Sequence, residues 1–240
     1  MRERLLDRLP VFAGLTLLAL AIGLGSFAMA DGIRNRNQND VISVTGSARR
    51  PIVSDYIVWT ASISSQHARP AAAAAQLSAW AGQFGTFLRA EGAQESEIAV
   101  QPVTTETLTD DNGEVTGYRL TRYFEVRSAR VEAIATLVES TSRLLARGIP
   151  VSANPPQYVY TKLPSLRPDL IAEATKDALA RARVLVEATG AELGRLRAVN
   201  VGVFQVTAPN STEVSDYGVY DTSTLNKDVT AVVNVSFAVK

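Results

Sequence analysis

The sequence predicts an α+β fold centred on a ferredoxin-like βαββαβ core. Several short segments alternate apolar and polar residues at period two, which is typical of half-buried strands. Other segments carry apolar residues at three- and four-residue spacing, which is typical of amphipathic helices. From Ser54 to Lys162 the two patterns follow one another as strand, helix, strand, strand, helix, strand. This order predicts an antiparallel sheet with both helices on one face. We expect the core to be extended by an extra N-terminal strand, a third helix and a C-terminal strand pair, after an N-terminal transmembrane or signal helix.

Composition narrows the function classes. The 240 residues include 24 Lys and Arg and 24 Asp and Glu, so no global field attracts nucleic acid. The absence of Cys excludes disulfides, thiolate metal ligands and a thiol nucleophile. The single histidine, His67, stands at the end of a predicted strand beside Pro70, and we expect it to be an exposed strand-end residue. We therefore predict no catalytic, cofactor-binding or metal site and no enzyme activity.

The N-terminus is predicted to target the chain to a membrane. Three arginines in the first eight residues precede Val11–Ala30, a run without charge that is long enough to span a bilayer. Two alternatives stay open, an uncleaved anchor and a signal peptide cut before Asp31, after the motif Ala-Met-Ala. We accordingly divide the chain into an anchor or signal segment at 1–30, a linker at 31–40 and a domain at 41–240.

The first half of the domain contains three predicted strands and one helix. Residues 41–46 form a short strand, and 54–66 form a second strand that alternates along its whole length. Pro70 fits the first turn of a helix that Gly92 ends. Residues 97–108 form the third strand, and Asp110-Asp111-Asn112-Gly113 predicts a hairpin turn to the fourth. No further carboxylates follow this turn at calcium-loop spacing, so we favour a plain turn over a cation site.

The fourth strand and second helix come next. Residues 118–126 alternate, and Ser128 occupies the position expected of a helix N-cap. Helical spacing then continues to Gly148, which we expect to close the helix in the left-handed conformation. Two prolines precede the strand predicted at 157–162 and place its start at an edge or bend.

The third helix is predicted from Pro168 to Thr189, stopped by Gly190. Its apolar face is expected to pack closely because it carries small residues; this face comprises Ala174, Ala178, Ala182 and Leu185. Glu173 and Asp177 share another face, which suits a paired-acid site or, more commonly, a solvated surface. We favour the solvated surface.

Two strands are predicted at 199–206 and 229–239, joined by the polar loop 207–227. A loop of this length is functional or disordered. Tyr217 and Tyr220 make it a possible interface with a neighbouring subunit, because Tyr is enriched where proteins associate. A mobile hairpin tip is the alternative, and the sequence does not decide between them.

The order of these motifs resembles the SIMPL-domain family of bacterial periplasmic and envelope proteins. The resemblance rests on Val41-Ile42-Ser43-Val44-Thr45-Gly46, Asp55, Gly117-Tyr118, Glu173-Ala174-xx-Asp177-Ala178-xxx-Ala182, Gly190-xxx-Gly194 and the closing Val-rich strand. Two positions depart from the family pattern, Ala48 in place of a second Gly and Asn226-Lys227 in place of Pro-Gly.

The resemblance implies no catalytic residues. It implies structural roles for Gly46, Asp55, Gly117, Tyr118, Ala174, Ala178 and Gly190. The glycines suit positive φ or close approach, and Asp55 suits the cap of a turn before its strand. The resemblance also implies a likeness to stress-protective periplasmic proteins and to relatives that assemble into large ring- or channel-like oligomers.

Two functions remain as hypotheses. The first is a non-enzymatic scaffold with a role in stress, a homo-oligomer held in the inner membrane by residues 11–30 with its C-terminal domain in the periplasm. The alternative is a soluble periplasmic module that binds a small molecule or stress ligand after signal cleavage. We expect its pocket to be lined by Trp59, Trp80 or Phe84. A hydrolase is a distant third, because no nucleophile-elbow pattern accompanies the lone histidine.

Overall fold

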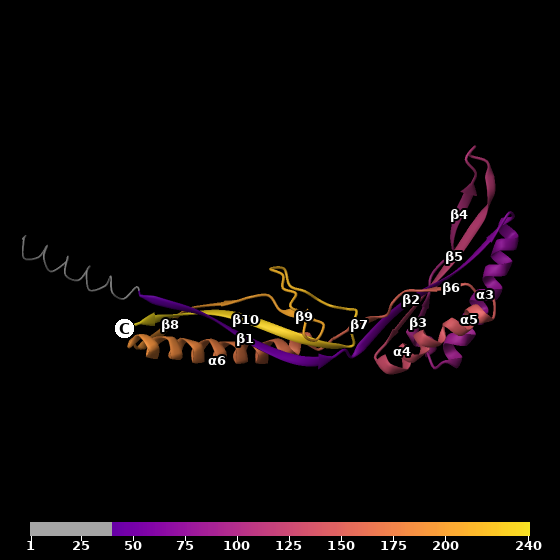
Figure 1. Cartoon of the computed structure of the whole chain (residues 1–240). Coiled ribbons are helices and arrows are strands. Elements are labelled where there is room, and N and C mark those ends of the chain that lie inside the picture. Colours follow the sequence, from indigo (N-terminus) through magenta and orange to yellow (C-terminus); the bar gives the residue numbers. More distant parts are fainter. Residues whose placement is uncertain (1–39) are drawn as a thin grey trace, which may run out of the picture. The chain divides into compact units, whose positions relative to one another are not determined.

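The computed structural model describes residues 40–240 (Figure 1). The predicted membrane segment at 11–30 lies outside them. The strands are β1 (Val41–Val53), β2 (Tyr56–His67), β3 (Ile98–Val100), β4 (Thr104–Thr109), β5 (Val115–Ser128), β6 (Val151–Ala153), β7 (Gln157–Val159), β8 (Leu193–Val201), β9 (Gln205–Thr207) and β10 (Asn226–Val239). The helices are α3 (Pro70–Ala90), α4 (Val131–Ser140), α5 (Ser142–Ala146) and α6 (Leu163–Thr189), with a 3₁₀ turn at Glu95–Glu97.

The described residues form two compact units. The first unit contains the residues up to Ala48 together with Ile171–Gly202 and Val232–Lys240. The second unit contains Arg49–Leu170 and Val203–Ala231. The elements β1, α6 and β10 each pass from one unit to the other, so the units share these segments.

The second unit confirms the ferredoxin-like core. Its sheet has the order β3-β5-β2-β6, with β4 also paired to β5 and β7 also paired to β2, all antiparallel. The edge strand predicted at 97–108 is divided into β3 and β4. The strand predicted at 157–162 is the shorter β7, and β6, which precedes it, was not predicted. Pro102 separates β3 from β4, and Pro155-Pro156 separates β6 from β7, because proline has no N–H to give to a ladder.

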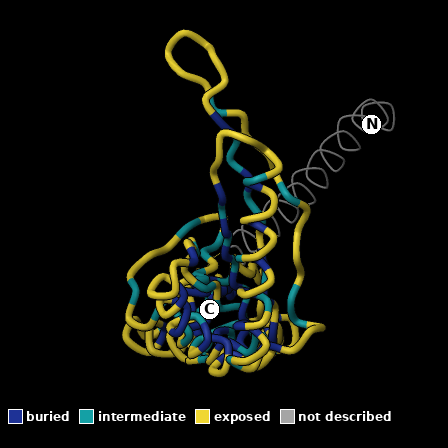
Figure 2. Tube along the Cα trace, turned by 90° about the vertical axis from the view of Figure 1, so that its right-hand side faces the viewer, coloured by how far each residue is buried: buried dark blue, intermediate teal, exposed yellow. Residues whose placement is uncertain are grey.

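The core of this unit is built by residues of the sheet and of its helices. Figure 2 shows buried segments enclosed by exposed ones. The alternating face of β2 supplies Ile57, Trp59, Ala61 and Ile63, all nearly inaccessible. Phe84 of α3 stands edge-on to Phe124 of β5, with ring centroids 4.8 Å apart. Trp59 and Phe84 are fully buried, with their ring centroids 6.3 Å apart. They therefore pack as core residues and do not line the ligand pocket expected there. The tip of the β4–β5 hairpin is exposed.

The second predicted helix is interrupted and starts later than expected. Arg130 is the N-cap residue of α4, and the prediction of Ser128 was wrong because Ser128 is the last residue of β5. Thr141 separates α4 from α5, and the Thr141 hydroxyl donates to the carbonyl of Val138 at 2.6 Å. Such local bonds compete with the helix backbone. Gly148 has φ 74°, as predicted for a left-handed closing residue.

In the first unit, a sheet of order β1-β10-β8 packs on α6 (Figure 1). The strand predicted to stop at residue 46 continues as β1 to Val53. Gly46 does not end the strand; it allows helix α6 to approach the backbone of β1 closely. A Cβ at Gly46 would lie 2.2 Å from the carbonyl oxygen of Ala174 and 2.7 Å from the Cβ of Ala178. Both alanines are fully buried, so the small-residue face of α6 is confirmed.

Helix α6 differs from the prediction at two points. It begins at Leu163, five residues before Pro168, which lies inside the helix. Leu185 is 47% exposed and therefore does not belong to the packed face, which continues through Val186. Asp177 accepts hydrogen bonds from the Ser47 amide at 2.8 Å and from Arg181, and these bonds lower the pKa of Asp177. Gly190 ends the helix at φ 71°, as predicted.

Candidate functional site

The outer edge of β8 is unpaired among residues 40–240. The strand predicted at 199–206 is instead β8 at Leu193–Val201 and the short β9. β8 pairs with β10 alone, in a register that joins Val199 to Val235 and Val201 to Val233. Its other side therefore presents free backbone donors and acceptors, as sheet edges do.

One face of β8 is both apolar and exposed. Val199 and Val201 share a face with the buried Val235 and Val233, their partners on β10. A register shift at Arg197 brings Leu196 opposite Phe237, onto the same face. Leu196, Val199 and Val201 are nonetheless 54%, 45% and 42% exposed. We call these three residues the β8 strip. Among residues 40–240, the side chains of β10 on this face are buried, whereas those of β8 are exposed.

In the second unit, the loop 208–225 is held by hydrogen bonds from strand residues. The buried Gln205 of β9 clamps it twice, because its side-chain amide donates to the Ser215 carbonyl at 2.6 Å and accepts from the Val219 amide at 2.7 Å. Val206 and Tyr220 form an isolated parallel bridge. Farther on, the Tyr158 amide donates to the Thr222 carbonyl at 2.7 Å. The loop, for which a mobile hairpin tip was one of two alternatives, is thus a hydrogen-bonded segment.

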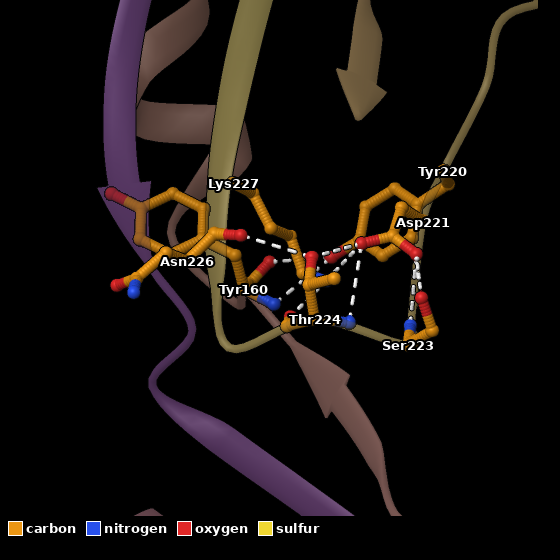
Figure 3. A network of polar contacts seen from close by, with 7 residues as sticks. All are labelled: Tyr160, Tyr220, Asp221, Ser223, Thr224, Asn226 and Lys227. Atoms are coloured by element: carbon orange, nitrogen blue, oxygen red, sulfur yellow. Dashed lines mark hydrogen bonds and ion pairs between the residues drawn. The ribbon is translucent and has the colours of Figure 1, made fainter. Parts of the chain in front are cut away.

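A buried ion pair closes this loop (Figure 3). The Lys227 side chain is 0% exposed, and its ammonium donates to the Asp221 carboxylate at 3.0 Å and to the Thr224 carbonyl at 2.5 Å. Ser223 and Thr224 also donate to this carboxylate. Burial works against the charge of Asp221, but these hydrogen bonds outweigh it and hold its pKa far below the ordinary value.

The two tyrosines of the loop have different surroundings. The Tyr220 hydroxyl accepts from the Tyr160 amide and donates to the Tyr160 carbonyl, both at 3.0 Å (Figure 3). Tyr217 is 97% exposed. Both tyrosines line a groove of about 410 Å³, together with Arg167, whose guanidinium lies 5.5 Å from the Phe204 ring centroid. Tyr220 thus has a structural partner in the chain, and Tyr217 faces solvent.

Asp55 caps a distant segment and not a turn beside its own strand. Its carboxylate accepts from the Thr161 amide at 2.7 Å and from the Thr161 hydroxyl at 3.0 Å, with the Lys162 ammonium at 3.6 Å. Burial opposes ionisation, but the bonds from Thr161 prevail and lower the pKa of Asp55. This contact fixes the chain immediately before α6.

The structure also gives the contacts of Gly117, Tyr118, His67 and Asp110. A Cβ at Gly117 would lie 3.1 Å from the His67 carbonyl oxygen, and Tyr118 pairs with His67 across the sheet. His67 is exposed, as expected, and its Nδ1 accepts from the Arg69 amide. Asp110 accepts from the Asn112 and Glu114 amides in a plain turn.

Within residues 40–240, no cluster of three or more potential metal ligands occurs, and no helix has the length and hydropathy to cross a membrane.

Sequence reasoning missed Gln205, Asp221 and Lys227. Gln205 and Lys227 are polar residues at the ends of apolar strands, a position that equally suits a turn. The sequence could have suggested the ion pair, because the oppositely charged Asp221 lies only six residues before Lys227, near the start of the last strand.

The described residues define an α+β protein that combines a ferredoxin-like core with a second, open-edged antiparallel sheet. The model of the SIMPL family, described as a protein of unknown function (DUF541), matches residues 42–237. The chain therefore belongs to the SIMPL family, as its motifs suggested, and the family description assigns no activity. The comparison with curated proteins gives no significant match.

Two solved structures are similar over most of their length. The ligand-free regulatory subunit of aspartate kinase from Thermus thermophilus is 16% identical, with 81% of this chain and 88% of that chain covered and a TM-score of 0.22. A hydrolase from Listeria innocua is 10% identical, with 80% and 91% covered and a TM-score of 0.20. At such scores neither structure bears on function.

Proposed function

We propose that this protein is a non-enzymatic envelope scaffold that assembles into a homo-oligomer. The β8 strip and the open edge beside it carry the proposal. A long edge strand with exposed apolar side chains is a surface that proteins normally cover or blunt. Pairing with a second copy would satisfy the backbone groups and bury the three side chains together.

The opposite edge of the same sheet supports a head-to-tail arrangement. β1 is the other outer strand in the order β1-β10-β8. If β8 of one copy joins β1 of the next, the two contacting surfaces differ, and such heterologous contacts close into rings when the rotation allows. A ring is therefore the assembly that we propose. We further propose that residues 11–30 gather the subunits on the inner membrane, with the domain in the periplasm and a role in stress.

The test compares two neighbouring residues on opposite faces of one strand. Val199→Asp places a carboxylate in the β8 strip, whereas Asn200→Asp places the same charge on the other face, where Asn200 pairs with Asn234. Both positions are exposed, so the fold should tolerate either change. Native mass spectrometry of the full-length chain in mild detergent reports assembly size.

We expect wild type and Asn200→Asp to form one defined multimer. Val199→Asp should raise the concentration for half-dissociation at least about tenfold, because a carboxylate buried without a partner is costly. A wild-type monomer would overturn the scaffold, and an unchanged Val199→Asp multimer would remove the β8 strip from the interface.

The loop needs a more selective test than deletion. Deleting 208–226 would also remove Asp221 and leave the Lys227 charge buried without its carboxylate, so weaker assembly in that variant could reflect lost stability. Tyr217→Ser avoids this difficulty, because the Tyr217 side chain is almost fully exposed. A smaller assembly in Tyr217→Ser, with unchanged thermal unfolding, would place the loop in the interface.

A further inference from the structure

The turn between β4 and β5 contains the only asparagine of the chain that is followed by glycine. Nine asparagines occur in the sequence, and Gly113 follows Asn112, whereas larger residues follow the other eight. Asn112 and Gly113 are both exposed, at the tip of the hairpin labelled β4 and β5 in Figure 1. The turn therefore presents to water a side-chain amide and a neighbouring backbone amide that can react with each other.

Little shields this pair of amides. Among residues 40–240, the Asn112 side chain makes no hydrogen bond or ion pair; its backbone amide alone is bonded, to the Asp110 carboxylate at 3.0 Å. A Cβ added to Gly113 would meet nothing within 4 Å. Because Gly113 itself has no side chain, its nitrogen can be approached closely. The Asn112 side chain is therefore free to rotate toward that nitrogen.

A hydrogen bond of the turn controls access to the Gly113 nitrogen. Its N–H donates to the Asp110 carbonyl at 3.0 Å, so the nitrogen is occupied while the turn is closed. Exposed turns open locally at a small cost in free energy, whereas amides inside a sheet become free only when the ladder opens. Asn200 and Asn234, which pair with each other across β8 and β10, lie in such a ladder. Exposure at the hairpin tip thus distinguishes Asn112 from them.

We propose that Asn112 deamidates spontaneously through a cyclic imide. The Gly113 nitrogen gives up its proton to water and attacks the side-chain carbonyl carbon of Asn112, so that a new N–C bond closes a ring. The bond from that carbon to Nδ2 then breaks, and Nδ2 leaves as ammonia. Water next adds to either ring carbonyl and breaks its bond to the Gly113 nitrogen. In the net reaction, amide and water become carboxylic acid and ammonia, and nothing is oxidised or reduced.

The two ring carbonyls give two products. Opening at the side-chain carbonyl leaves aspartate in a normal backbone. Opening at the main-chain carbonyl leaves isoaspartate, in which the chain runs through the side chain and is longer by a methylene group. The Asp110 carboxylate holds the turn through the amides of Asn112 and Glu114, at 3.0 and 2.9 Å, so a longer backbone between these amides would disrupt it. The site lies in the second unit and uses none of the β8 strip, so it is independent of the proposed scaffold.

The test is peptide mapping by mass spectrometry, after the full-length protein in mild detergent has been incubated at mildly alkaline pH in heavy-oxygen water. We expect Asn112 to take up heavy oxygen and to give both isoaspartate and aspartate. Asn210 is also exposed, but Ser211 follows it, and it should convert at least about tenfold more slowly because a Cβ hinders approach to the nitrogen. No conversion at Asn112 by the time that a peptide of residues 107–117 is half converted would overturn the proposal. So would aspartate as the sole product, which indicates direct hydrolysis.

Two variants identify the reacting groups. Gly113→Ala should slow the conversion of Asn112 at least about tenfold, for the same steric reason. Because alanine is strained at the φ of 82° found at Gly113, Asn112→Gln provides a second measurement. It keeps an amide at this position, but the longer side chain must close a larger ring, and residue 112 should stay unconverted. Wild-type rates in either variant would overturn the role of the Gly113 nitrogen.

A third variant separates the added charge from the longer backbone. Asn112→Asp adds the carboxylate but keeps the backbone length, so amide hydrogen exchange at Glu114 should match that of fresh wild type. In the isoaspartate form of the wild-type chain, this exchange should be about tenfold faster, because the bonds that hold the turn are lost. Equal exchange in the two proteins would overturn the disruption of the turn.

Discussion

Gly46→Ala tests the close approach of β1 to α6 in the first unit. The added Cβ would stand 2.2 Å from the Ala174 carbonyl oxygen, 2.4 Å from the Ala178 amide nitrogen and 2.7 Å from the Ala178 Cβ. Ordinary contact begins at 3.4 Å, so strand and helix would have to separate by about 1 Å. Two of the three atoms are backbone and cannot move by a rotamer change.

The expected cost follows from this geometry. Overpacking a well-packed core typically costs about 1–3 kcal/mol, and a clash with backbone belongs at the upper end of that range. We expect Gly46→Ala to lower the free energy of unfolding by about 3 kcal/mol and the Tm by roughly 10 °C. Adding Ala178→Gly should restore less than half of this loss, because it removes the one side-chain contact only.

The assay is thermal unfolding of the full-length chain in mild detergent, followed by circular dichroism at the helix band. Gly82→Ala is the matched control, since Gly82 lies inside α3 with nothing within 4 Å of its added Cβ. Alanine is the better helix former, so the control should match wild type or gain up to about 1 kcal/mol. A Gly46→Ala protein that unfolds with wild type would refute the close-packing argument.

Two further predictions concern charge. Lys227→Met leaves the Asp221 carboxylate without its ammonium partner, and we expect the free energy of unfolding in urea to fall by about 3 kcal/mol. Lys162→Met is the control: the Lys162 side chain is 70% exposed, so the free energy of unfolding should change by less than about 0.5 kcal/mol. Hydrogen bonds from Arg130, aided by Ser128 and Gln94 against the cost of burial, lower the pKa of Glu97 from 4.5 to about 2. Because the folded-state pKa is depressed, this stabilisation is complete above about pH 4.5 and is lost as pH falls toward 2. Glu97→Gln should flatten the pH dependence of unfolding in that window, and an unchanged slope would count against the contact.

The elements predicted correctly are those in which burial follows a local period. Ile57, Trp59 and Ile63 alternate along β2, and all three are core residues. Ala174 and Ala178 lie one turn apart on α6, and both are buried. When one face of a strand or helix packs against one neighbouring element, its buried residues recur at a fixed spacing. This spacing can be read from the sequence alone.

The errors arise where the period is broken. In β8, the register shift at Arg197 puts Leu196 and Val199 on one face although they are three residues apart. Alternation fails there, and the strand was placed too late. At Thr141, a hydroxyl bond to the preceding turn divides a helix whose apolar spacing is continuous. Both breaks depend on individual bonds that a periodicity argument does not contain.

Contacts between distant residues were the least predictable part of the candidate surfaces. Asp55 accepts from Thr161, 106 residues away, and no spacing rule connects them. From the sequence, Lys227 was expected at the end of the polar loop 207–227. In the structure its ammonium is buried against Asp221 and sets the end of the loop.

This ion pair bears on whether the loop is suited to the proposed assembly. A disordered segment pays its ordering entropy when it binds, which lowers affinity. Here Gln205 and Lys227 fix the loop within the chain, and Tyr220 is tied to Tyr160. Tyr217 is therefore presented on a backbone that is already ordered, so an interface using it would lose little conformational entropy on association. Weakening the pair with Lys227→Met should then reduce assembly more than Tyr217→Ser does, because it removes this preorganisation as well as stability.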